Sequence, residues 1–200
     1  MSEVTRRDVL YQIGAGLTLA GNVSAQTARH AHHAITQAKA SGPYKPQALN
    51  PHEYAALRRL ADLIIPADAK SKGALDAGAP EFIDFLCSRN EELKAIYTGG
   101  LAWLDAEMKR RYSAVFVKAQ SAQQTALLDL IAYRKNASPE LNAGIQFFEW
   151  ARNMVTDAFY TSRAGMADLG FMGNGAMSEF SVPKEAVDYA LSRSPLKGSA

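Results

Sequence analysis

From Asn50 onward, apolar residues recur at the three- and four-residue spacing of amphipathic helices, and no run of useful length alternates with the period of a strand. Asn50-Pro51-His52-Glu53 has the pattern of a capping box with proline in the first turn, and Pro66 ends the helix that follows. Further helices are expected at 80–89, 91–112, from a capping box at 121–124, at 144–163 and at 183–191. The sequence therefore predicts an all-α fold, an irregular bundle of about five to six helices.

Several glycines interrupt these patterns. Gly99 and Gly100 fall inside the expected 91–112 helix, where each costs up to ~1 kcal/mol relative to alanine. They predict either a close helix crossing or a break in the helix. Gly165 follows the 144–163 helix and suits its C-terminal cap.

The N-terminus has the layout of an export signal. Arg6 and Arg7 precede an uncharged run over 12–26, and Val23-Ser24-Ala25 offers small residues for cleavage before Gln26. The apolar part, Ile13–Val23, is about half the ~20 residues that a membrane-spanning helix needs, so no transmembrane segment is expected. We interpret residues 1–25 as a twin-arginine signal, which carries folded proteins to the periplasm. The alternatives are an ordinary Sec signal with a chance arginine pair and a frayed cytosolic terminus.

The remaining chain divides into two parts. Residues 26–49 are rich in alanine, histidine, glutamine and serine, which predicts a flexible linker with solvated histidines at 30, 32 and 33. Residues 50–200 are expected to form a single helical domain.

Charge and cysteine content exclude several classes of protein. Lysine and arginine number 22 against 20 aspartates and glutamates, a net charge of +2, which gives no reason to expect nucleic acid or an anionic membrane as partner. The lone Cys87 excludes a disulfide within one chain. Its apolar neighbours favour a buried thiol, and a bond to another chain is the alternative.

The sequence contains no recognisable nucleophile, phosphate-binding, dinucleotide-binding or metal-ligand motif, so no catalytic, cofactor or metal residue is assigned. His52 is the one histidine in the folded part, and we expect it to be exposed and idle. Five acids could converge on the loop after the first helix and act as an acid–base pair or bind calcium: Asp62, Asp68, Asp76, Glu81 and Asp84. Helix caps and solvated charges explain them more simply.

Two features suggest a surface for another protein. Phe147, Phe148, Trp150 and Phe159 cover more than one face of a helix, either as core alone or as core plus an exposed patch. The glycine-rich segment 165–175 is too apolar for an idle linker, so it packs under its own domain or against a partner. The docking candidates are Trp150, Phe159, Asp168, Gly170, Phe171, Gly173 and Asn174.

Three motifs occur in order: Ala61-Asp62-Leu63-Ile64-Ile65-Pro66, Ala77-Gly78-Ala79-Pro80-Glu81-Phe82-Ile83-Asp84, and Phe147-Phe148 with Phe159-Tyr160-Thr161-Ser162. With Asp168-Leu169-Gly170-Phe171-Met172-Gly173-Asn174, they make residues 50–175 resemble the gluconate 2-dehydrogenase subunit 3 family. The resemblance implies a small subunit whose partner is a large, FAD-dependent, GMC-type dehydrogenase. It also implies that a cytochrome c accepts the electrons and that the small subunit escorts the large one through export.

Together these observations predict a non-catalytic small subunit that binds, matures and escorts the FAD-dependent subunit of a periplasmic sugar dehydrogenase of the gluconate or glucoside type. The chain itself is expected to hold no cofactor, and its partners could associate it with the membrane. The alternative is a stand-alone periplasmic enzyme or binding protein that uses the carboxylate-rich loop 68–84. A purely structural helical domain that anchors a complex is a third interpretation.

Overall fold

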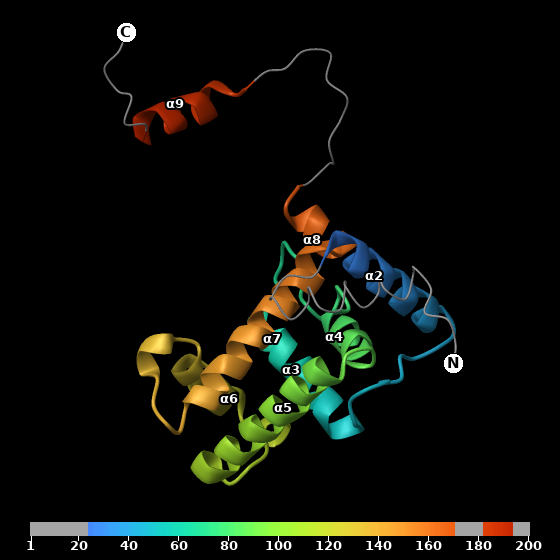
Figure 1. The fold of residues 1–200 in the computed structure, drawn as a ribbon, viewed down its shortest axis with the longest axis vertical. Coiled ribbons are helices and arrows are strands. Elements are labelled where there is room, and N and C mark those ends of the chain that lie inside the picture. The colour runs from blue at the N-terminus through green and yellow to red at the C-terminus, as the bar shows by residue number, and fades with distance from the viewer. Residues whose placement is uncertain (1–23, 171–181, 194–200) are drawn as a thin grey trace, which may run out of the picture. The chain divides into compact units, whose positions relative to one another are not determined.

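The computed structural model describes residues 24–170 and 182–193. Within these ranges the chain forms eight α-helices and two short 3-10 helices, with no strand, which confirms the predicted all-α class (Figure 1). The elements are α2 (Ala25–Ala40), α3 (Pro51–Ile64), α4 (Ala79–Cys87), α5 (Glu91–Tyr112), η1 (Phe116–Lys118), α6 (Ser121–Ile131), η2 (Arg134–Asn136), α7 (Asn142–Tyr160), α8 (Arg163–Asp168) and α9 (Lys184–Arg193).

The short helix α4 forms the centre of the first unit, residues 1–170. Every residue of α4 is buried, and α2, α3, α5 and α7 all pack against it (Figure 1). Its sequence is apolar on all sides apart from Glu81 and Asp84, as a helix buried all round requires. The long helix α7 also contacts α3, α5, α6 and α8, so it connects the core to the end of the unit where α8 lies.

Local signals in the sequence position the helix ends. Asn50 Oδ1 accepts the Glu53 N–H at 2.9 Å, and Glu53 Oε2 accepts the Asn50 N–H at 2.9 Å, so the predicted capping box is present. Helix α3 then ends at Ile64, two residues before the proline. The box at α6 begins one residue earlier than predicted, because Gln123 Oε1 accepts the N–H of Gln120 at 3.0 Å.

The two glycines of α5 mark a close crossing rather than a break, since the helix is continuous from Glu91 to Tyr112. A Cβ added at Gly100 would lie 2.0 Å from Cδ2 of Phe147 on α7, whereas one added at Gly99 would meet nothing within 4 Å. Gly144 of α7 similarly faces Trp103 of α5, where an added Cβ would lie 2.2 Å from Cη2. Glycine thus allows α5 and α7 to approach closely at two points.

The prediction of a flexible linker over 26–49 is wrong. Residues 25–40 form helix α2, which buries Ala28, Ala31 and Ile35 and packs against α4. The helix carries only a narrow stripe of small apolar residues, so its composition resembles that of a linker. Docking onto α4 supplies the stability that this sequence lacks in isolation.

The junction between α7 and α8 also differs from the prediction. Helix α7 ends at Tyr160, and Ser162 begins a new helix by accepting the Gly165 N–H on its Oγ at 3.1 Å. Gly165 is therefore not a C-terminal cap. It lies inside α8, where an added Cβ would be 2.2 Å from the carbonyl oxygen of Phe159.

The second unit, residues 171–200, is described only over 182–193, where α9 buries none of its residues. Three docking candidates, Phe171, Gly173 and Asn174, lie outside the described residues, as do Arg6 and Arg7. Ala25 is described and is the first residue of α2. In the described part of the chain, no helix combines the length and apolar character needed to span a membrane.

Candidate partner-binding surface

The acids predicted to converge on the loop after α3 do not form one site. Asp84 is fully buried, and its carboxylate accepts four hydrogen bonds from residues 44–49. The donors are the Tyr44 hydroxyl at 2.8 Å and the backbone N–H groups of Gln47, Ala48 and Leu49 at 2.7, 3.1 and 2.9 Å. Burial, together with this hydrogen bond, raises the pKa of Tyr44 well above its usual range. Asp84 therefore fastens the segment before α3 to the central helix.

Structural contacts also engage the other acids. Glu81, almost completely buried, forms an ion pair with Lys39 of α2 at 2.7 Å, and Asp62 pairs with Arg59 at 2.8 Å. Asp68 Oδ1 accepts two backbone N–H groups of its own loop, which lowers the pKa of Asp68, and Asp76 accepts the Gly73 N–H at 3.0 Å. Within residues 24–170 and 182–193, no group of three or more histidines, cysteines, aspartates or glutamates is placed to hold a metal ion.

The histidines are more engaged than the sequence suggests. His52 is half-exposed as predicted, but it is not idle, because Nε2 contacts Oδ2 of Asp105 on α5. His32 does not lie in a solvated linker: its ring packs 5.0 Å from that of Phe82, and Nε2 lies 3.0 Å from Thr161 Oγ1. Burial lowers the pKa of His32. His52 connects α3 with α5, and His32 connects α2 with α4.

Cys87 is completely buried, as predicted, and it is a free thiol. Burial, with a smaller contribution from the Asp84 carboxylate, raises the pKa of Cys87 to about 12. In this fold the thiol is therefore protonated and shielded from a second chain.

The aromatic set of α7 is mostly core. Phe147, Phe148 and Phe159 are buried, which removes Phe159 from the docking candidates, and Trp150 is partly buried against the core. Phe147 packs against Gly100 and Tyr97 of α5, away from solvent.

In the described part of the first unit, the exposed large apolar side chains are Tyr133 and three residues at the end of α7 and around α8, and others lie on α9. Tyr160 is 40% exposed, Met166 38% and Leu169 62%. Met166 lies on α8, and Leu169, three positions further on, is its C-cap residue, so the two side chains are neighbours. Met166 and Leu169 lie within the glycine-rich segment 165–175 that the sequence singles out for docking.

A cleft of about 320 Å³ lies between α8 and the loop that follows α3. Its walls are Lys70, Ser71, Lys72, Arg163, Ala164, Ala167 and Asp168. Asp168 was a predicted docking residue, whereas the three cations were not. The only sequence signal for them is a pair of alternating lysines in the loop after Pro66 and an arginine directly after the helix-capping Ser162.

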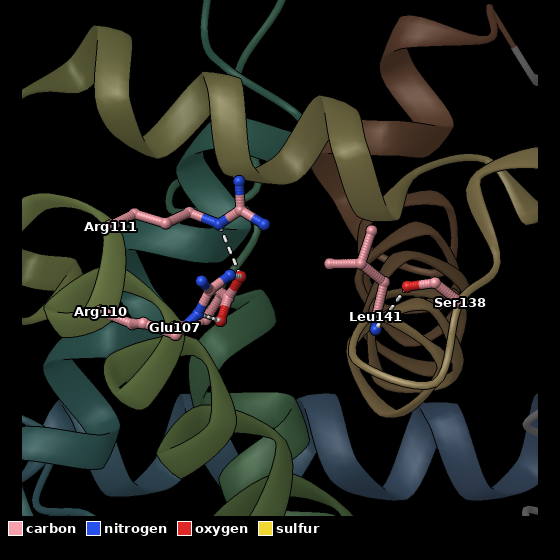
Figure 2. Close-up of polar contacts among 5 residues, drawn as sticks. All are labelled: Glu107, Arg110, Arg111, Ser138 and Leu141. Carbon is pink, nitrogen blue, oxygen red and sulfur yellow. Dashed lines mark hydrogen bonds and ion pairs between the residues drawn. The ribbon is translucent and has the colours of Figure 1, made fainter.

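Lys70, Lys72 and Arg163 form no ion pair with a described residue. Arg110 and Arg111 show the contrast, since both side chains converge on Glu107 at 2.6 and 2.5 Å (Figure 2). The hydrogen bond from Arg110, reinforced by Arg111, lowers the pKa of Glu107 to about 2. Unlike that closed cluster, Lys70, Lys72 and Arg163 keep their charges available to a ligand or partner.

A family model described as gluconate 2-dehydrogenase subunit 3 matches residues 51–177. The match begins at the first residue of α3 and extends beyond α8, so it includes both walls of the cleft. Neither a curated protein nor a solved structure matches the chain.

Proposed function

This chain belongs to the gluconate 2-dehydrogenase subunit 3 family, and we propose that it is the non-catalytic small subunit of a periplasmic, FAD-dependent sugar dehydrogenase of the gluconate or glucoside type. In this proposal it binds the large, GMC-type catalytic subunit, assists its maturation in a chaperone-like way and escorts it through the twin-arginine route. The large subunit holds the FAD and oxidises the sugar, and a cytochrome c takes the electrons. Any association with the membrane is made through these partners.

The family match over residues 51–177 carries the proposal, because the family is named as a subunit of a dehydrogenase. The positions of the acids support a non-catalytic role. Asp84 is buried among four hydrogen-bond donors and Glu81 is held by Lys39, so neither is free to act as an acid or base on a substrate. We therefore do not carry forward the alternative of an enzyme or binding protein built on loop 68–84.

The exposed apolar residues of α8 support a role in binding a protein. Met166 of α8 and Leu169, its C-cap residue, are large apolar side chains that stay 38% and 62% exposed. Exposed large apolar side chains close together are typical of protein–protein contact surfaces.

The escort role is tested by replacing Arg6 and Arg7 together with lysine and co-expressing the chain with the FAD-dependent subunit of the proposed complex. We expect both proteins to remain in the cytoplasm, because the twin-arginine route depends on the arginine pair. The control replaces two exposed arginines of the folded part, Arg29 and Arg152, with lysine, and should leave export unchanged.

Fractionation of the cells separates the interpretations. Export of the flavoprotein in the Arg6→Lys, Arg7→Lys strain would contradict the escort role and would favour a purely structural anchor that acts after export.

A further inference from the structure

We propose that the cleft between α8 and loop 70–72 is the electrostatic part of the interface with the catalytic subunit, and that it receives an acidic segment of that subunit. This inference rests on the proposed function and specifies where the partner docks and what its surface carries. The cleft brings three cations, Lys70, Lys72 and Arg163, together with a single carboxylate, Asp168.

Hydrogen bonds within the loop hold residues 70–72, which form one wall of the cleft, in one backbone conformation. Asp68 Oδ1 accepts the N–H groups of Lys70 and Ser71, each at 2.7 Å, and the Asp68 N–H returns to the carbonyl of Ser71 at 3.0 Å. Gly73 closes the loop tightly, since an added Cβ would lie 2.5 Å from the backbone nitrogen of Ala67. The two lysines are thus held on a braced turn, which reduces the entropy lost when a partner binds.

The helical wall is held with similar rigidity. Ser162 Oγ caps α8 through the Gly165 N–H at 3.1 Å, and Gly165 packs directly on the backbone of Phe159 and Tyr160. These contacts fix Arg163 at the first position of the helix, facing the lysine loop across the cleft. A side chain that is already positioned before binding favours a specific interaction over loose attraction.

The chemistry of the walls identifies the occupant. Three cations that are unpaired among the described residues would strengthen their interactions most by meeting carboxylates. A volume of about 320 Å³ accommodates several side chains of a polypeptide. The expected partner surface is therefore an acidic segment.

The test measures the affinity of the purified chain for the FAD-dependent subunit at low and high salt. Lys70→Glu with Lys72→Glu should weaken binding at least tenfold at low salt, and the effect should shrink as salt screens the charges. Arg163→Glu should act in the same direction. The matched control is Lys109→Glu with Lys118→Glu, which makes the same change of charge at the far end of α5 and in η1, remote from α8 (Figure 1).

Circular dichroism establishes that each variant is folded, and the neutral pair Lys70→Gln with Lys72→Gln provides a milder change if charge reversal unfolds the loop. Equal affinity of the wild type and both cleft variants would overturn the inference while leaving the proposed function intact. Equal weakening by the control pair would overturn it as well, since net charge alone would then explain the effect. A wild-type chain that does not bind the flavoprotein at all would overturn the proposed function itself.

Discussion

Replacing Gly99 and Gly100 separately by alanine makes the same chemical change at neighbouring positions of α5, with opposite expected effects on stability. Alanine is better than glycine inside a helix by about 0.5–1 kcal/mol. At Gly99 an added Cβ meets nothing within 4 Å, so the full gain should appear as a higher free energy of unfolding.

At Gly100 the same Cβ would lie 2.0 Å from Cδ2 and 2.1 Å from Cγ of Phe147. Ordinary carbon contacts are about 3.5 Å or more, so the ring must retreat by about 1.5 Å. Phe147 is buried and packs edge-on against Tyr97 with ring centroids 5.8 Å apart, which leaves little room for that movement. Overpacking of this kind costs typically about 1–3 kcal/mol, which exceeds the gain in helix propensity.

Because the gain in helix propensity is the same at both positions, we expect Gly100→Ala to be less stable than Gly99→Ala by the overpacking cost, about 1–3 kcal/mol. Urea denaturation followed by far-ultraviolet circular dichroism measures both values, and the slopes against urea should agree with that of the wild type. The double variant Gly100→Ala, Phe147→Leu should recover part of the loss, because the smaller side chain leaves room for the added methyl group. Equal stability of the two alanine variants would refute the close crossing of α5 and α7.

Three further predictions follow from the buried polar groups. Asp84→Asn should lower the free energy of unfolding by about 3–5 kcal/mol, because an amide cannot accept all four hydrogen bonds. Asp62→Asn on the surface should lower it by less than about 1 kcal/mol. Similar losses for the two variants in urea denaturation would contradict this. The folded-state pKa of Glu107 is lowered from 4.5 to about 2, so its stabilising effect should be complete above pH 4.5 and lost as the pH falls toward 2. The unfolding temperatures of Glu107→Gln and the wild type should therefore converge over that range. A difference that persists at pH 2 would count against this prediction. Cys87 should resist a thiol reagent at pH 8 until urea unfolds the chain, and rapid labelling of the native protein would show that the thiol is accessible.

The sequence predicts the helices whose signals are local and misses the elements that depend on tertiary contacts. The 91–112 helix and the cap at Asn50 occur as predicted, because periodicity and capping act within a few residues. Helix α2 was missed because its buried stripe, Ala28, Ala31 and Ile35, is small, and α4 supplies the packing that stabilises it.

The candidate site was predicted only in part. Asp168 lies within the glycine-rich segment 165–175 and lines the cleft, and its role in docking stays a prediction. Lys70, Lys72 and Arg163 were not identified, because loop 70–72 and α8 are far apart in sequence and only the folded domain brings them together. Phe159 was misassigned as a docking residue because spacing along a helix shows that an aromatic face exists, but not which neighbouring helices cover it.

The most direct test of the central claim is to purify the chain after co-expression with the FAD-dependent subunit and to record the absorption spectrum across the eluted peak. If the chain is the small subunit of a dehydrogenase, the flavoprotein should elute with it, carry the flavin absorbance and oxidise its sugar, whereas the chain expressed alone should elute without flavin and without activity. Flavin absorbance that remains with the isolated chain, or elution of the two proteins as separate peaks, would contradict the account.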